Sequence, residues 1–188
     1  EFRRVLFRSL ARGGDRFIST PELSFSILNL RAQGGLNVSA SHNPPDDNGA
    51  KIYNQLGGQE VPPHDEELVD IVEKEVRAVR RLPWDEAIAA GNIHFLDIAV
   101  HDAYVRENLS RSLKRSARSA KVVFTPLHGT GDGTVAAVLS AAGFSVEIEP
   151  TQATHDGAFP NVPFAAPNPE VPQSMDRAVA LAEAQIGR

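Results

Sequence analysis

Residues 121–150 read KVVFTPLHGTGDGTVAAVLSAAGFSVEIEP, and this stretch decides the fold class. Residues 122–124 are an apolar run that predicts a buried strand, and the glycines within residues 129–133 predict a turn after it. Residues 135–142 have the composition of a helix, and residues 145–149 alternate as a second strand does. A strand, a helix and a strand in this order predict a crossover unit and a largely parallel or mixed sheet.

The rest of the chain repeats this alternation of strands and helices. Residues 22–33 carry apolar side chains at helical spacing, with Pro21 in the first turn and Ser19 or Thr20 as the N-cap. Strands are predicted at residues 36–40 and 50–54, and helices at residues 64–81, 84–92 and 97–114 and from about Gln173. We therefore predict an α/β fold made of two incomplete α/β domains, each a mixed sheet with packed helices.

The two ends of the chain suggest that it is a fragment. Residues 1–9, EFRRVLFRS, contain no Met and no signal-peptide core, and they reverse-translate onto a common sequencing-library adapter. We interpret them as an assembly artefact, and the alternative is a basic N-terminal strand. At the other end, the helical pattern of residues 175–188 is not followed by a strand. We expect one domain over residues 10–96 and a second over residues 97–188, with a part of each missing.

The composition limits the classes of function. The chain has 188 residues, a formal net charge of −5 and no cysteine. The acidic balance argues against a nucleic-acid or anionic-membrane partner, and no apolar run approaches the roughly 20 residues of a membrane helix. The absence of cysteine excludes disulfides, thiolate zinc sites and a cysteine nucleophile. We expect a cytoplasmic protein without a nucleic-acid or membrane partner, and the oligomeric state stays open.

The loop in residues 37–51, NVSASHNPPDDNGAK, is the candidate functional site. Ser41 follows a predicted strand, in a loop stiffened by two prolines, where functional residues are often found. His42 is its neighbour, and adjacent side chains on an extended chain point apart, which argues against a Ser–His dyad. The chain also lacks the G-x-S-x-G elbow of many serine hydrolases. A serine that carries a phosphoryl group instead needs exposure to solvent, hydrogen-bond donors to the phosphate and a metal ion. His42, Asn43 and Lys51 supply such donors, although a proline-stabilised turn explains the loop equally well.

This loop resembles the phosphoserine loop of the α-D-phosphohexomutase family, the phosphoglucomutases and phosphomannomutases. The family's usual form is Thr-(Ala/Gly)-Ser-His-Asn-Pro followed by Asn-Gly and a Lys, and this chain has Ser39 in place of Thr. The segments FTPLHGTG, at residues 124–131, and FPNVPFAAPNPE, at residues 159–170, also resemble the family's second domain. The resemblance extends from about residue 11 to residue 188. It implies the C-terminal part of domain 1 followed by a truncated domain 2.

The resemblance also implies roles for individual residues. Ser41 would be the phosphorylated serine, which exchanges its phosphoryl group with a sugar phosphate through a sugar bisphosphate intermediate. A phosphate oxygen on Ser41 would bind Mg²⁺. His42 and Lys51 would be hydrogen-bond donors and candidate general acid and base, and Asn43 and His128 would lie in the phosphate environment. The implied reaction interconverts sugar 1-phosphates and sugar 6-phosphates, and the identity of the sugar, a glucose, mannose or pentose derivative, stays open.

Several observations keep alternatives open. The family's metal loop, Asp-x-Asp-x-Asp-Arg, is absent from the chain, and Asp46 and Asp47 are more typical of turn formers than of metal ligands. We therefore expect the isolated chain to be inactive. The alternatives are a non-catalytic sugar-phosphate-binding relative and a phosphatase that works through a phosphoserine at Ser41. His128 fits a tight turn as well as a phosphate site. The histidines without ligand spacing are expected to be exposed or satisfied: His64, His94, His101 and His155.

Overall fold

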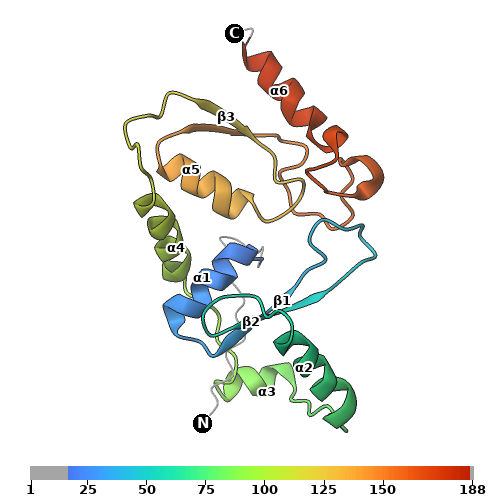
Figure 1. Ribbon diagram of the computed structural model, residues 1–188. Helices are drawn as coiled ribbons and strands as arrows, with labels where there is room; N and C mark the ends of the chain where they lie inside the picture. The colour runs from blue at the N-terminus through green and yellow to red at the C-terminus, as the bar shows by residue number, and fades with distance from the viewer. Residues whose placement is uncertain (1–16, 187–188) are drawn as a thin grey trace.

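The computed structural model describes residues 17–186 (Figure 1). Residues 1–9, which we interpret as an artefact, lie outside this range. The elements are, in chain order, α1 (Thr20–Leu30), β1 (Gly34–Val38), β2 (Ala50–Asn54), α2 (His64–Asp70), the π-helical turn η1 (Ile71–Glu75), α3 (Trp84–Ala89), α4 (Ile98–Ser110), β3 (Lys121–Phe124), the π-helical turn η2 (Asp132–Ala136), α5 (Ala137–Ala141), β4 (Ser145–Ile148), the 3-10 turns η3 (Pro163–Ala165) and η4 (Pro172–Met175), and α6 (Asp176–Ile186).

The strands form two small sheets. β3 and β4 are parallel, with Lys121 opposite Ser145 and Phe124 opposite Ile148, and η2 with α5 forms the crossover between them. β1 and β2 are antiparallel, with Leu36 opposite Ile52. The α/β class is thus confirmed. Within residues 17–186 each sheet has two strands, one pair antiparallel and the other parallel, so neither sheet is mixed in this part of the chain, unlike the expectation.

α1 begins and packs as the sequence predicts. The Oγ atom of Ser19 caps the helix by accepting a hydrogen bond from the N–H of Glu22 at 3.4 Å, and a proline follows the cap. Leu23 and Ile27, one helical turn apart, are buried against Tyr53 of β2 and form the core of this part of the molecule. Ile52, the neighbour of Tyr53, is 40% exposed, so Tyr53 is the residue of β2 that faces the core.

The helix predicted over residues 64–81 is too long. α2 and η1 together end at Glu75, and Val76 has the extended torsions φ −73° and ψ 105°. The apolar stripe of the predicted helix, Ile71, Val72, Val76 and Val79, is exposed, and Val79 is 75% exposed. Because most helical stability in proteins comes from packing an apolar face, a stripe without a packed partner does not sustain the last turns.

α4 connects the two parts of the molecule. It begins with Asp97 as its N-cap, because Oδ1 of Asp97 accepts a hydrogen bond from the N–H of Ala99 at 2.8 Å. The helix lies beside α1 on one side and beside α5 on the other (Figure 1). We refer to residues 17–96 as the first half and to residues 97–186 as the second half. No helix in the described residues is long and apolar enough to cross a membrane.

Candidate functional site

The Ser41 loop closes the β1–β2 hairpin. The N–H of Ser39 donates to the carbonyl of Gly49 at 2.9 Å and holds the two ends of the loop together. Ser41 has a φ of 61°, in the left-handed region, which few residues other than glycine adopt without strain. Its backbone N–H donates to Oγ of Ser39 at 3.0 Å, and its side chain is exposed. Strained backbone of this kind is concentrated at functional sites, so the geometry marks Ser41 as a candidate functional residue.

The polar residues after Ser41 hold the loop in shape. The Nδ2 atom of Asn43 donates to Oδ2 of Asp47 at 3.0 Å, and the N–H of Asp47 donates to the carbonyl of Pro44 at 3.0 Å. The N–H of Gly49 donates to Oδ1 of Asn48 at 2.9 Å. Asp47 therefore takes part in the turn, as its Pro-Asp-Asp-Asn-Gly context predicts. The loop supplies its own hydrogen bonds and leaves Ser41 open to solvent.

The structure brings some predicted site residues together and leaves one apart. Ser41, His42 and Asn43 are exposed in one loop, and Lys51 is the second residue of β2, which follows it. Within residues 17–186 no hydrogen bond or ion pair joins the side chains of Ser41, His42 and Lys51. Lys51 is the cross-strand partner of Asn37, whose Nδ2 atom donates to Oγ1 of Thr20 at 2.8 Å. Lys51 thus shares the face of the hairpin that lies toward the N-terminus of α1.

His128 lies in the second half, at the carboxyl end of β3. It is 4% exposed and has a φ of 64°. Its N–H donates to the carbonyl of Gln152 at 2.9 Å, and its Nδ1 atom lies 2.7 Å from the carbonyl oxygen of Thr154. Because a carbonyl only accepts, Nδ1 carries the proton and Nε2 keeps its lone pair in the neutral ring. Nε2 is buried, with no hydrogen-bond partner in the described residues. His128 thus fastens the loop after β3 to the loop after β4.

A buried glutamine completes this attachment, and no sequence pattern predicted it. Gln152 is fully buried. Its Oε1 atom accepts from Oγ1 of Thr125 at 2.7 Å, its Nε2 atom donates to the carbonyl of Asn161 at 2.8 Å, and its N–H donates to Oε2 of Glu149 at 2.8 Å. Ligands of α/β proteins bind at the carboxyl ends of parallel strands, which is the edge that this network shapes.

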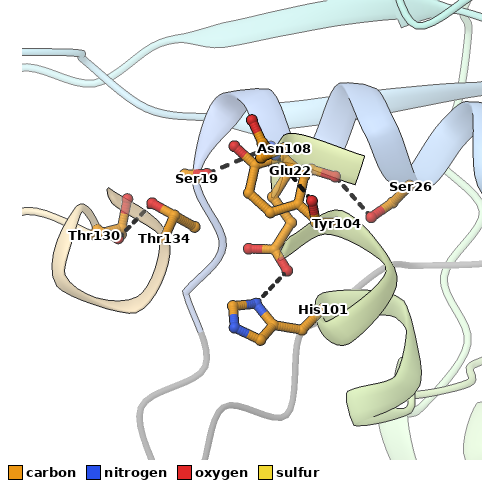
Figure 2. Close-up of polar contacts among 8 residues, drawn as sticks. All are labelled: Ser19, Glu22, Ser26, His101, Tyr104, Asn108, Thr130 and Thr134. Atoms are coloured by element: carbon orange, nitrogen blue, oxygen red, sulfur yellow. Dashed lines mark hydrogen bonds and ion pairs between the residues drawn. The ribbon is translucent and has the colours of Figure 1, made fainter. Parts of the chain in front are cut away.

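A cavity of about 610 Å³ lies between the two halves. Two histidine–carboxylate pairs line it. His101 Nδ1 lies 2.9 Å from Oε1 of Glu22, and His155 Nε2 lies 2.9 Å from Oδ1 of Asp132. Figure 2 shows His101 on α4 reaching Glu22 on α1, with Thr130 and Thr134 nearby in the second half. Each of these two histidines thus has a carboxylate partner.

The carboxylate partners of these histidines were not predicted. Glu22 and His101 are 79 residues apart, and Asp132 and His155 are 23 residues apart. Neither spacing occurs within one helix or one turn, so no local sequence pattern predicts these two pairs. The predicted helix at α4 does place one face toward the cavity, with Ile98, Asp102 and Arg106 on it at i, i+4 spacing. The spacing of these residues in the sequence could have indicated this face of the helix.

The described residues do not fit a magnesium site by themselves. They contain no group of three or more histidine, aspartate or glutamate side chains that could hold a metal ion. Near Ser41 the carboxylates are Asp46 and Asp47, and the second of these already accepts a hydrogen bond from Asn43. Mg²⁺ therefore stays a prediction from the family resemblance.

Comparison with known proteins agrees with both halves of the structure. Residues 9–78 match the sequence model of the phosphoglucomutase/phosphomannomutase alpha/beta/alpha domain I, and residues 102–187 match that of domain II. A phosphoglucomutase of Staphylococcus saprophyticus is 33% identical over 88% of this chain and 31% of its own length. A phosphoribomutase of Saccharomyces cerevisiae is 29% identical over 89% of this chain and 29% of its own length.

A solved structure is similar over nearly the whole chain. It belongs to a candidate phosphomannomutase of Thermus thermophilus and covers 94% of this chain and 36% of its own, with a TM-score of 0.69 and 26% identity. The chain thus spans about a third of the length of the curated relatives and of the solved structure that it matches.

Proposed function

Because the chain belongs to the phosphoglucomutase/phosphomannomutase family through residues 9–78 and 102–187, we propose that it carries the phosphoryl-transfer serine of a phosphohexomutase. The reaction interconverts a sugar 1-phosphate and a sugar 6-phosphate. The observation that supports this proposal is Ser41 itself, exposed and left-handed in a loop closed by its own hydrogen bonds. The curated relatives include a phosphoglucomutase and a phosphoribomutase, so the identity of the sugar has to be determined by experiment.

The proposed chemistry is a double phosphoryl exchange. A hydroxyl oxygen of the sugar phosphate bonds to phosphorus as the bond between phosphorus and Oγ of Ser41 breaks, and the hydroxyl proton passes to a base. The bisphosphate then turns round and returns its other phosphoryl group to Ser41, whose Oγ bonds to phosphorus while the sugar oxygen regains a proton. We assign the acid and base roles to His42 and Lys51, and the orientation of the phosphate to Asn43.

The arrangement suits this chemistry because phosphoryl transfer depends on positioning and on neutralising charge. The left-handed backbone and the hydrogen bond to Ser39 fix the position of Ser41 before substrate binds. Lys51 lies on a strand and not in the loop, so its ammonium group is carried by a more rigid support. A lysine is a common partner of phosphate oxygens in proteins.

We expect the 188-residue chain to be inactive as a mutase, so the step to be tested is a single phosphoryl transfer to Ser41 and not turnover. It contains no Asp-x-Asp-x-Asp-Arg loop, and the described residues hold no metal cluster. Metal ions and charge clamps each contribute several kcal/mol in such reactions. Magnesium dependence and a cytoplasmic location are part of the proposal.

The test is to incubate the purified chain with glucose 1,6-bisphosphate and to map phosphorylation by mass spectrometry. We expect phosphate on Ser41, none in Ser41→Ala, and retained phosphorylation in Ser39→Thr, which keeps the hydroxyl group that holds the loop. No conversion of glucose 1-phosphate above the Ser41→Ala control is expected. Phosphate on another residue would refute the role of Ser41.

The two alternatives give different results in the same assay. A non-catalytic sugar-phosphate-binding relative would bind glucose 1-phosphate and leave Ser41 unmodified. A phosphatase would release inorganic phosphate steadily, without isomerisation, and Ser41→Ala would abolish the release.

A further inference from the structure

The boundary between the two halves is formed by matched residues of two helices. Glu22 of α1 contacts His101 of α4, with 2.9 Å between Oε1 and Nδ1. Three residues further along both helices, Phe25 contacts Tyr104 edge-on, with ring centroids 5.6 Å apart. Because residues three apart lie on one face of a helix, these contacts form two successive steps along the same pair of faces.

Glu22 is an unusual residue to find in this place. Its side chain is 6% exposed, and a buried carboxylate is costly unless a donor compensates it. The start of α1 is fixed around it, since Ser19 accepts from its N–H and Ser26 donates to its carbonyl at 2.7 Å (Figure 2). The described donor to its side chain is His101, which belongs to the other half of the molecule.

The strand that leads into the Ser41 loop is packed against α1. A Cβ atom on Gly35 of β1 would lie 2.7 Å from Cδ1 of Ile27, so the strand and the helix are in close contact. Asn37 of β1 also donates to Thr20 at the start of α1. A change in the direction of α1 is therefore transmitted to the hairpin that carries Ser41. On the other side, α4 packs against α5 in the second half.

The geometry points to Glu22 and His101 as a positioning pair. We propose that their hydrogen bond sets the orientation of α1, and with it the Ser41 loop, relative to the second half of the chain. The consequence for phosphoryl transfer rests on the proposed function, whereas the orientation itself can be measured without any activity.

Distance measurements between spin labels test the pair directly. The chain has no cysteine, so Gln33→Cys in the first half and Ser140→Cys in the second give two unique labelling sites, both exposed. We expect one narrow distance distribution in the otherwise unchanged chain. His101→Leu, which removes the donor, should shift or broaden it.

Two matched variants separate positioning from general destabilisation. His101→Asn keeps a donor near the place of Nδ1 and should restore the original distribution. Glu107→Gln removes an exposed ion pair with Arg111 on the same helix and should leave the distribution unchanged. If His101→Leu does not fold, Glu22→Met replaces it, because it keeps the approximate length of the side chain and removes the acceptor of the hydrogen bond.

The outcomes are distinct. An unchanged distribution in the folded donor-free or acceptor-free variant overturns the positioning pair, whether or not Ser41 accepts phosphate. A shift that His101→Asn does not restore also overturns it. Conversely, a Ser41 that stays unmodified contradicts the proposed function and has no bearing on these distances.

Discussion

The backbone N–H of Ser41 donates a hydrogen bond to the Oγ atom of Ser39, across 3.0 Å. This bond holds Ser41 in the left-handed conformation, with φ at 61°. The hydroxyl group at position 39 is thus a structural part of the loop. A threonine, which the family resemblance gives as the usual residue at this position, would keep this hydroxyl group.

The first prediction concerns this hydroxyl group. Ser39→Ala should slow phosphorylation of Ser41 by about three- to tenfold, since one such hydrogen bond contributes roughly 0.5–1.5 kcal/mol. Ser39→Thr should keep the rate within a factor of about two, because the acceptor remains. The measurement is the initial rate of phosphate incorporation from glucose 1,6-bisphosphate. Equal rates for the alanine and threonine variants would show that the bond does not organise the loop.

The second prediction concerns His128 and its unusual backbone. His128→Leu should lower the free energy of unfolding by about 1–3 kcal/mol, because the carbonyl of Thr154 loses its buried donor. His128→Asn should cost less, since asparagine tolerates a left-handed φ and can supply a donor. Urea denaturation of both variants is the measurement, and His64→Leu, on the surface, is the control. A leucine variant as stable as the control would contradict the hydrogen-bond assignment.

The third prediction concerns the buried glutamine at the same edge of the sheet. Gln152→Leu should destabilise the chain by about 1–3 kcal/mol, because Thr125 and Asn161 lose their partners. Gln173→Leu, at an exposed position of η4, is the matched control and should change stability by less than about 0.5 kcal/mol. The comparison needs only the midpoints and slopes of urea unfolding. Equal losses in both variants would show that the network around Gln152 contributes little.

The elements that local pattern determines were predictable from the sequence. The crossover unit was confirmed because strand and helix periodicity, glycines and a short parallel register all agree within residues 121–150. α1 was predicted for the same reason, with its cap, its proline and its apolar spacing in agreement. The helix over residues 64–81 was wrong beyond Glu75 because its last turns depend on packing that the sequence does not reveal.

The site was predictable only in part, for a related reason. The Ser41 loop is a contiguous segment, so its residues and turns could be read directly. The pair of Glu22 and His101 joins positions 79 residues apart, and Gln152 is buried within the proline-rich residues 150–172, which have no regular apolar periodicity. Long-range contacts of this kind are set by how helices and loops pack, and a single sequence carries no local trace of them.

The last prediction concerns the contact by which α1 carries the Ser41 hairpin. Gly35→Ala should destabilise the chain by about 1–3 kcal/mol, because the added Cβ atom would lie 2.7 Å from Cδ1 of Ile27 in a packed core. Gly133→Ala is the control, since a Cβ atom there meets nothing within 4 Å. Combining Gly35→Ala with Ile27→Val removes the clashing atom and should recover part of the loss.

Thermal and urea unfolding of these variants decide the point. If the double variant is no more stable than the sum of the two single losses predicts, the overlap is relieved by another movement. The hairpin would then not be fixed to α1 as the close contact requires.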